Sequence, residues 1–505
     1  MRRASLRRTA SITDLRFTLR RVFGKDAFRP VQEEVITAVV AGHDVFVCAA
    51  TSFGKSLCYQ LPAVVSLGVT VVISPLLALM ENQVHAAKAL GIAVEMINGR
   101  TALTDRRRIE ADLLCGHPET KLLYVTPELC ALDRFRNIIM QIHRQGQLVR
   151  VAIDEAHCIS EWGHDFRPAY RDLIWLKTSL NCPPVPMMAV TATATKQVRD
   201  DIFEFLGLDH DKTKCFSTST SRPNIHYEVQ YLSESNPKTG DDDMFSHLLS
   251  KLEFMHRRRV TLLRHLRQRD PSAAVPPITG IVYVTMRATA DTVASKLTGA
   301  NIRASAYHAG LDPDKREKIQ RLFERHGKAD PRLLQVEDDE GIAASFNIIC
   351  ATTAFGMGID VSSIRFVIHY GLPKGMEAFA QESGRAGRDN KAASSIILYT
   401  REEATRCEYR MSCEAAKDKS KAKTESRFES LKRIVEFCEN TSTCRHELVS
   451  RYFGDKKDAA ECYYACDVCK EGPARLRQRK EKGLATEEQA IEFTQREPMR
   501  YDDYE

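Results

Sequence analysis

Short apolar runs alternate with amphipathic stretches along most of this chain. In its first half, continuous apolar runs rich in β-branched residues occur at DVFVCAA, TVVISP, KLLYVTPE, VRVAIDEAH and VPMMAVTATA. Strands that are buried on both faces of a parallel sheet have this composition. The runs are separated by stretches such as LLALMENQVHAAKAL, whose apolar residues follow helical spacing. The pattern predicts a doubly wound α/β domain over residues 15–217.

The same alternation begins again after residue 217. TGIVYVTM, ASAYHAG, FNIICAT, IRFVIHYGL and SSIILYT predict a second α/β lobe over residues 218–400. Two segments interrupt it, at about 236–278 and 329–345, and we interpret both as surface excursions. The first contains the basic stretch MHRRRVTLLRHLRQR. A charged helix face is usually only solvated, although a basic one can also contact nucleic acid.

The remaining segments are helical or polar. Residues 401–475 are expected to form a small helical region that carries a cysteine cluster, and residues 476–505 a charged tail. Residues 1–14 read as a basic tail that runs into the first helix. The first 21 residues hold seven arginines and one acid, Asp14, so a mitochondrial transit peptide is the alternative.

Composition narrows the class of protein. The 505 residues are 43% hydrophobic and 28% charged, as is typical of globular proteins. No stretch approaches the ~18–20 apolar residues of a membrane span. Fifteen cysteines without a secretory segment argue against a disulfide scaffold. The net charge of +6 gives only a weak indication of an anionic partner.

A phosphate-binding loop is predicted where the first strand meets its helix, at AATSFGKS. Backbone N–H groups and the helix N-terminus would hold the phosphates. Lys55 would add a point charge at the β and γ oxygens, and the Ser56 hydroxyl would reach Mg²⁺. The nucleotide-binding residues predicted in this loop are Thr51, Ser52, Phe53, Gly54, Lys55 and Ser56.

Two further elements complete a phosphoryl-transfer site. Asp154 and Glu155 follow the strand VRVAI, where ligand sites of open α/β sheets collect. Asp154 would hold Mg²⁺, and Glu155 would position or deprotonate the attacking water. In the second lobe, QESGRAGR supplies Gln381, Arg385 and Arg388. An arginine from this lobe would stabilise transition-state charge, and we favour Arg388 over Arg385 for that role.

Many motifs occur in one order, and together they resemble the RecQ family of superfamily 2 helicases over about residues 15–470. They are FGKDAFRPVQ, TSFGKSLCYQLPA, VVISPLLALMENQV, LLYVTPE, IDEAHCISEWGHDFRPAY, VTATAT, YHAGL, ATTAFGMGID and QESGRAGRD. The resemblance implies two tandem RecA-like lobes followed by a zinc-binding module, and an ATP- and Mg²⁺-dependent DNA helicase that moves 3′ to 5′.

The resemblance also implies roles for individual residues. Gln32, with Arg29, would recognise adenine. Gly358 and Asp360 would face the nucleotide from the second lobe. Trp162, Phe166 and Arg167 would contact single-stranded DNA, because aromatic faces stack on bases and arginine adds charge.

Four cysteines near the C-terminus have the spacing of a structural zinc site, and the segment resembles the zinc-binding part of RecQ proteins. Cys462, Cys466 and Cys469 form a close trio behind Cys444. His446 is a possible substitute ligand, although we favour the four thiolates. Cys407 and Cys438 lie in helical patterns and are expected to be unrelated buried residues.

Three functions remain in view. The first is a monomeric DNA helicase of repair, recombination or replication that acts in the nucleus on single-stranded, duplex or branched DNA. The others are an RNA helicase and a nucleic-acid-binding scaffold with an inactive ATPase. A small domain needs about 50 residues, and fewer than that follow Cys469 in this sequence. We therefore expect no winged-helix or HRDC domain, as in a short family member or a truncated chain.

Overall fold

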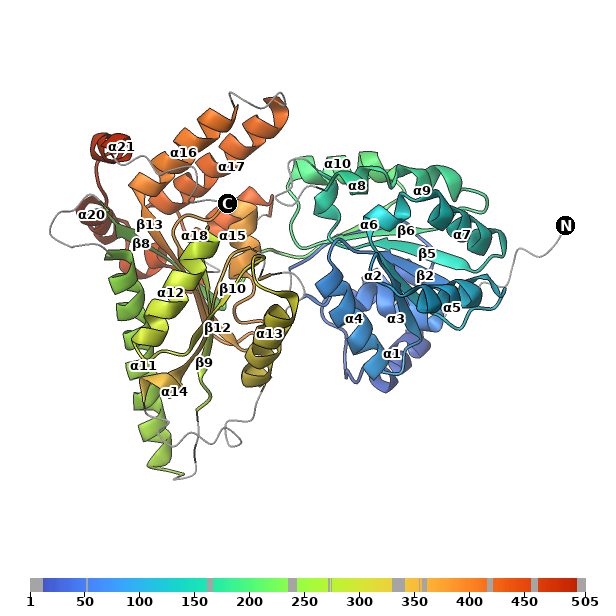
Figure 1. The fold of residues 1–505 in the computed structure, drawn as a ribbon, viewed down its shortest axis with the longest axis horizontal. Helices are drawn as coiled ribbons and strands as arrows, with labels where there is room; N and C mark the ends of the chain where they lie inside the picture. The colour runs from blue at the N-terminus through green and yellow to red at the C-terminus, as the bar shows by residue number, and fades with distance from the viewer. Residues whose placement is uncertain are drawn as a thin grey trace. The chain divides into compact units, whose positions relative to one another are not determined.

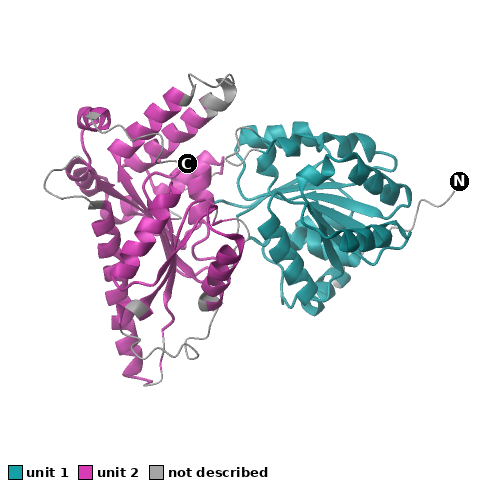
Figure 2. Cartoon of the chain, viewed as in Figure 1, with its two compact units in different colours: residues 1–220 teal, residues 221–505 magenta. Residues whose placement is uncertain are grey.

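The chain folds into two compact units, Met1–Thr220 and Ser221–Glu505 (Figure 2). The computed structural model describes residues 12–50, 53–160, 167–234, 243–270, 273, 275–328, 341–353, 355–356, 361–415, 421–455 and 462–496. Within these ranges no helix is both long and apolar enough to cross a bilayer. The cysteine-bearing region after residue 400 is part of the second unit.

The first unit is built on a parallel sheet with the order β3-β4-β2-β5-β6-β1-β7 (Figure 1). Helices cover both faces of this sheet, so its central strands are buried on both sides, as the five wholly buried residues of β2 show. The strands are β1 (Val45–Cys48), β2 (Val69–Ile73), β3 (Val94–Ile97), β4 (Leu122–Val125), β5 (Leu148–Ile153), β6 (Met187–Thr191) and β7 (Lys214–Ser217).

Some helices of the first unit begin and end at residues suited to those places. Helix α10, for example, starts after Thr195, whose hydroxyl accepts the Val198 N–H, and stops at Gly207 with a left-handed φ of 60°. The helices are α1 (Ile12–Arg21), α2 (Gln32–Val40), α3 (Leu57–Val65), α4 (Leu77–Ala89), α5 (Leu103–Leu114), α6 (Pro127–Cys130), α7 (Asp133–Arg144), η2 (Ala156–Ile159), α8 (Pro168–Arg171), α9 (Ile174–Ser179) and α10 (Lys196–Leu206).

The second unit has its own parallel sheet, with the order β10-β11-β9-β12-β13-β8. Two parallel sheets with helices on their faces confirm the predicted fold class of two RecA-like lobes. The strands are β8 (Ile225–Leu232), β9 (Ile278–Tyr283), β10 (Ala304–Tyr307), β11 (Phe346–Ala351), β12 (Ile364–Tyr370) and β13 (Ala393–Thr400).

The helices of the second unit fall into two groups along the chain. Those that cover the sheet are α11 (Asp243–Arg267), α12 (Arg287–Gly299), α13 (Pro313–Lys328), α14 (Ile342–Ser345) and α15 (Met376–Ser383). Those of the cysteine-bearing region are α16 (Arg401–Ala415), α17 (Lys421–Glu439), α18 (Arg445–Tyr452), α19 (Asp467–Glu471), α20 (Pro473–Gly483) and α21 (Glu487–Arg496).

One sequence interpretation is wrong for the segment 236–278. Most of it is helix α11, and the first half of α11 is not a surface excursion. Leu248 and Leu252 are fully buried in the hydrophobic cluster that also holds Val282 of β9. The interpretation failed because the arginines of the second half of α11 dominate the sequence pattern. Leucines at helical spacing nevertheless line the buried face of the helix. Of the second predicted insert, residues 329–340 lie outside the described residues, and Ile342–Ser345 forms α14.

Candidate nucleotide site and zinc centre

The predicted phosphate loop connects β1 to α3. Lys55 is largely buried, and its Nζ donates to the Ala49 carbonyl at 2.9 Å. Gly54 has a φ of +83°, and a Cβ at this position would lie 2.9 Å from Gln32 Nε2. Glycine is therefore favoured here by its backbone conformation, and a larger residue would also displace the Gln32 amide.

Gln32 joins the predicted adenine motif to this loop. Its Nε2 donates to the Phe53 carbonyl at 2.6 Å, and its Oε1 accepts the Arg29 N–H at 2.8 Å. The Gln32 side chain is buried, while Arg29 is exposed. Both bonds use the two ends of one amide, so Gln32 fixes the position of Arg29 relative to the loop.

Asp154 lies at the carboxyl end of β5 in a mostly buried setting. Its Oδ2 accepts the Tyr59 hydroxyl at 3.2 Å, and the Tyr170 hydroxyl donates to its main-chain carbonyl at 2.9 Å. Burial, followed by the charge of Glu155, raises the pKa of Asp154 to about 7, although Lys55 acts to lower it. The sheet thus brings the Lys55 ammonium within electrostatic reach of this carboxylate.

Glu155 begins a line of polar contacts that ends on β6. Its φ of 49° is unusual for a residue other than glycine and turns the chain sharply after β5. Glu155 Oε2 lies 3.3 Å from His157 Nδ1, which is 3.0 Å from Thr191 Oγ1. The Thr191 hydroxyl donates in turn to the Thr193 carbonyl at 2.9 Å. These contacts connect the Glu155 carboxylate to Thr191 and Thr193 at the carboxyl end of β6.

In the second unit, the predicted arginines follow α15. Arg385 is buried, and its guanidinium donates to the Gly356 carbonyl. Arg388, three residues on, is partly buried, and Gln381 on the last turns of α15 is buried. Arg385 is therefore bound within its own unit.

The arginine loop is braced from a residue that the sequence did not single out. Arg222 donates to the carbonyls of Gly384, Ala386 and Gly387 at 3.1, 3.0 and 2.8 Å. Three bonds from one planar guanidinium fix the loop as a rigid unit. Arg222 therefore orients the segment that carries Arg385 and Arg388.

The four predicted cysteines come together after α17. The Sγ atoms of Cys444, Cys462, Cys466 and Cys469 all lie within 4.8 Å of one another, and those of Cys444 and Cys466 are 3.9 Å apart. Four sulfurs bound tetrahedrally to zinc at ~2.3 Å would be about 3.8 Å apart. The cluster therefore fits a closed zinc site without an open position.

His446 and the other two cysteines stand apart from this cluster. His446 Nε2 lies 3.0 Å from the Ala465 carbonyl, and its ring packs on Tyr227 at 4.6 Å. Cys407 and Cys438 belong to α16 and α17 and are not among the clustered thiols.

The cysteine region covers the outer edge of the second sheet. Strand β8 is an edge strand, yet the Tyr227 N–H donates to the Ala465 carbonyl and the Val229 N–H to Asp467 Oδ2. Asp467 is fully buried and pairs with the fully buried Arg445 at 3.0 Å. An uncovered edge of this length would invite pairing with other chains. The cysteine region thus completes the second unit.

Family models match three consecutive segments of the chain. They are described as DEAD/DEAH box helicase over residues 29–201, Helicase conserved C-terminal domain over 263–390 and RecQ zinc-binding over 401–470. The chain is 38% identical over 456 residues to the RecQ-like DNA helicase blm-1 of Caenorhabditis elegans, covering 90% of this chain and 41% of that protein. It is 37% identical over 475 residues to the ATP-dependent DNA helicase Q5 of Rattus norvegicus, covering 92% and 44%.

The chain belongs to the RecQ helicase family. It spans less than half the length of these two RecQ relatives. Since the RecQ zinc-binding model covers the four clustered thiols, the metal of this centre is zinc.

Solved helicase structures share the fold of this RecQ chain. The DUF1998 helicase MrfA bound to DNA and AMPPNP superposes with a TM-score of 0.57 at 15% identity, covering 92% of this chain and 60% of that one. Dbp5 of S. cerevisiae bound to RNA and ADP BeF3 gives a TM-score of 0.53 at 12% identity, covering 93% and 99%. At such identities the likeness shows the fold alone.

Several predicted RecQ site residues lie outside the described residues, namely Thr51, Ser52, Trp162, Phe166, Gly358 and Asp360. Arg167, beside the aromatic-rich loop, is described. Its Nη1 donates to the Pro75 carbonyl at 2.7 Å, just after the end of β2. Its charge therefore sits at the carboxyl edge of the first sheet.

Tertiary packing adds functional residues that sequence reasoning missed. Tyr59 and Tyr170 hold Asp154, and Arg222 with Asn224 holds the arginine loop. Both tyrosines lie inside helices whose pattern shows only burial. The RPN of TSRPNIHYEV, which ends the connection between the units, was the one available signal for Arg222 and Asn224.

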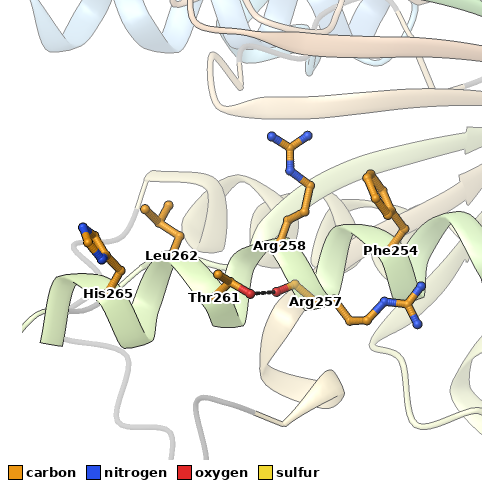
Figure 3. Close-up of a pocket in the computed structure, with 6 residues that line it drawn as sticks. All are labelled: Phe254, Arg257, Arg258, Thr261, Leu262 and His265. Atoms are coloured by element: carbon orange, nitrogen blue, oxygen red, sulfur yellow. Dashed lines mark hydrogen bonds between the residues drawn. The ribbon is translucent and has the colours of Figure 1, made fainter. Parts of the chain in front are cut away.

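The basic stretch of the predicted first insert forms one exposed face of α11. Phe254, Arg257, Arg258 and Leu262 lie along this face with Thr261 and His265 (Figure 3). Phe254 and Leu262 are each about half exposed. The opposite side of the helix is anchored by Arg259, which donates to the Val275 carbonyl at 2.6 Å.

Proposed function

We propose that this chain is an ATP-driven DNA helicase that translocates 3′ to 5′ on single-stranded DNA and unwinds duplex or branched DNA. The placement of Lys55 near the Asp154–Glu155 pair, at the carboxyl ends of β1 and β5, carries this proposal. That edge is where open α/β sheets bind ligands. The RecQ relatives named above are DNA helicases, which supports DNA as the polymer.

Each polar residue then has a distinct task. Lys55 would balance the charge of the β and γ phosphates, and Gln32 with Arg29 would contact the base. Ser56 and Asp154 would hold Mg²⁺, which supplies charge neutralisation at the phosphates. Glu155 would orient and deprotonate the attacking water, with His157 and Thr191 keeping its carboxylate in place. Phosphoryl transfer depends mainly on such positioning and electrostatic stabilisation.

Arg388 of the second unit would supply a cation that stabilises the transition state of ATP hydrolysis. An arginine that acts on transition-state charge raises turnover more than ground-state affinity. Arg388→Ala should therefore bind ATP nearly normally and lose most of its DNA-stimulated turnover. Loss of ATP binding in this variant would instead make Arg388 a nucleotide-binding residue. Arg365→Ala, which removes a partly buried arginine paired with Asp389, is the control.

The deciding experiment compares ATPase rates with single-stranded DNA, duplex DNA and RNA of equal length. Single-stranded DNA should stimulate hydrolysis most, and duplexes with a 3′ tail should be unwound in preference to those with a 5′ tail. Stimulation by RNA alone would make the chain an RNA helicase, and DNA binding without stimulation would make it a scaffold. Trp162→Ala should keep basal hydrolysis and lose the stimulation.

Genome maintenance in the nucleus is the setting that this activity suggests, in repair, recombination or replication. The RecQ kinship supports this setting, and expression of a tagged chain with its natural N-terminus tests it. Accumulation in mitochondria would identify the arginine-rich first residues as a transit peptide.

A further inference from the structure

The cysteine-bearing region contains an acidic groove with an apolar floor, formed by three helices. Helix α16 is its base, and α17 and α21 are its walls; Figure 1 shows α16 and α17 as a pair with α21 beside α16. The groove has a volume of about 730 Å³. Helix α21 is held in place by the buried Ala490 and by Arg401, whose Nη1 donates to the Ala485 carbonyl at 2.6 Å.

Apolar side chains from all three helices line the groove. They include Ala404, Phe428, Leu431, Val435 and Ile491. Ile491 is 47% exposed, although its neighbour Ala490 is fully buried. An isolated exposed aliphatic residue is ordinary, but this one joins a continuous concave surface.

Carboxylates surround this floor. The groove is lined by Glu408, Glu425, Glu429, Glu436, Glu439 and Glu487, against the cations Arg401 and Lys432. Three of the glutamates have ion-pair partners: Glu439 pairs with Arg401 and Lys480, and Arg433 pairs with both Glu429 and Glu436.

The remaining three glutamates, Glu408, Glu425 and Glu487, are exposed and belong to different helices. Among the described residues none of them forms an ion pair. Each wall and the base of the groove thus present one carboxylate that is available to an incoming cation.

The charge excludes two occupants. DNA phosphates would be repelled by the glutamates, so the groove lies outside any DNA path. The residues after α21, EPMRYDDYE, carry four acids and one arginine and would be repelled as well. The occupant must be cationic at its edges and apolar along one side.

We propose that this groove, defined by α16, α17 and α21, binds a basic amphipathic helix of a partner protein. Two helical walls over a helical base match the helix-in-groove mode of recognition, in which anchors at i, i+3, i+4 and i+7 enter an apolar groove. Lysines or arginines on the flanks of that helix would pair with Glu408, Glu425 and Glu487. This interaction is independent of nucleotide hydrolysis.

The test uses a fluorescent synthetic helix of leucine and lysine with one apolar face, and a scrambled peptide of the same composition. Anisotropy is measured against the full zinc-loaded chain at ~150 mM salt, where distant surface charges are screened. The amphipathic peptide should bind saturably and at least about tenfold more tightly than the scrambled one, as an apolar face requires. Equal binding of both peptides, or no saturable binding, would overturn the proposal.

Variants locate the binding. The triple change Glu408→Lys, Glu425→Lys and Glu487→Lys should weaken binding at least about tenfold, since like charges then face each other. Reversal of the exposed Glu119, Glu204 and Glu481 outside the groove is the matched control and should leave the affinity unchanged. Equal weakening by both triple variants would show that the peptide senses only overall charge.

A second variant tests the apolar floor. Ile491→Ser should weaken binding about threefold or more while the melting temperature stays the same, because this side chain is already half exposed in the free chain. Unchanged affinity in this variant would contradict docking in the groove. The peptide should also leave single-stranded DNA bound, and displacement of the DNA would place the peptide on the motor instead.

Discussion

The nucleotide site of the first unit and the zinc centre of the second are both polar clusters, but they hold their polar groups in opposite ways. At the nucleotide site, Lys55 donates to the Ala49 carbonyl, and burial together with the charge of Glu155 raises the pKa of Asp154 to about 7. At the zinc centre, four thiols face one another and the flanking Asp467 and Arg445 are fully buried. The first cluster is arranged for an incoming charge, and the second is closed on itself.

This difference predicts different consequences of mutation. Where polar groups await a ligand, removal of one should change chemistry and spare the fold. Where they satisfy one another inside the protein, removal of one leaves buried charges or thiols without partners and should weaken the fold.

Removal of zinc should have the largest effect. Structural zinc contributes ~10–16 kcal/mol to small zinc domains, so Cys466→Ser or strong chelation should abolish the cooperative melting of the second unit. The first unit, whose cores contain no residue of the cysteine region, should still melt as before. Calorimetry and metal analysis provide the measurement, with about one zinc expected per wild-type chain.

Cys413→Ser serves as the control, because Cys413 is in α16 outside the cluster and is partly exposed. Its melting curve should match that of the wild type. A zinc-free chain with an intact second melting transition would show that the metal is dispensable for this fold.

The next effect comes from the buried ion pair beside the zinc centre. Asp467 accepts bonds from Arg445 Nε, Val229 N and Val468 N, and all of these groups are buried. Asp467→Asn keeps the shape but leaves the Arg445 charge uncompensated, so it should cost about 3–5 kcal/mol of stability in the second unit.

Chemical denaturation of the second unit measures this loss. The control is Glu317→Gln, which breaks an exposed ion pair with Arg321 in the same unit and should cost at most ~1 kcal/mol. Equal stabilities of the two variants would mean that the buried pair does not hold the cysteine region to β8.

At the nucleotide site, the expected loss is in turnover. Lys55→Ala and Glu155→Gln should each reduce DNA-stimulated ATP hydrolysis by ~10²-fold or more, which corresponds to about 3 kcal/mol of transition-state stabilisation. The melting temperature of the first unit should barely change, because neither side chain belongs to its hydrophobic cores. Wild-type turnover in either folded variant would contradict the site assignment.

The sequence was most informative where one local pattern determines the structure. Central strands such as β2 were predicted because burial on both faces makes them continuously apolar. Strand β8 was missed because apolar and polar residues alternate in IHYEVQYL, so it contains no continuous apolar run. The backbone groups at its edge are covered by the cysteine region, which lies more than 200 residues later in the chain. The short strands β3 and β7 were also missed, because polar residues interrupt VEMI and KCFS and leave no continuous apolar run.

The same division holds at the candidate site. Motifs predicted Lys55, Asp154 and Glu155, since the loop and the strand end each carry a local signal. Tyr59 and Arg222 act through contacts 95 and 162 residues away in the chain, to Asp154 and Gly384. A single sequence has no pattern that pairs such distant residues, so these supporting side chains emerged only from the packed structure.

The last expected effect appears only as a dependence of stability on pH, and it concerns a carboxyl group that belongs to neither cluster. Glu403, on the first turn of α16, accepts the Leu372 N–H at 2.8 Å. Burial, together with the charge of Glu234, raises its pKa from 4.5 to about 7, although the Leu372 N–H, Arg406 and Arg410 act to lower it. Burial therefore raises the pKa of Glu403 as it does that of Asp154, but Glu403 does not belong to the predicted nucleotide site.

Because the folded chain binds this proton more tightly than the unfolded chain, the stability that Glu403 contributes is complete below pH 4.5 and is lost as the pH rises through about 7. Across this window the free energy of unfolding of the wild type should fall relative to that of Glu403→Gln, by up to about 1.4 kcal/mol per pH unit. Above it the difference should be constant. Glu408→Gln, an exposed change on the same helix, should show no such trend, and parallel curves for Glu403→Gln would show that this carboxyl ionises in the folded chain as easily as in the unfolded one.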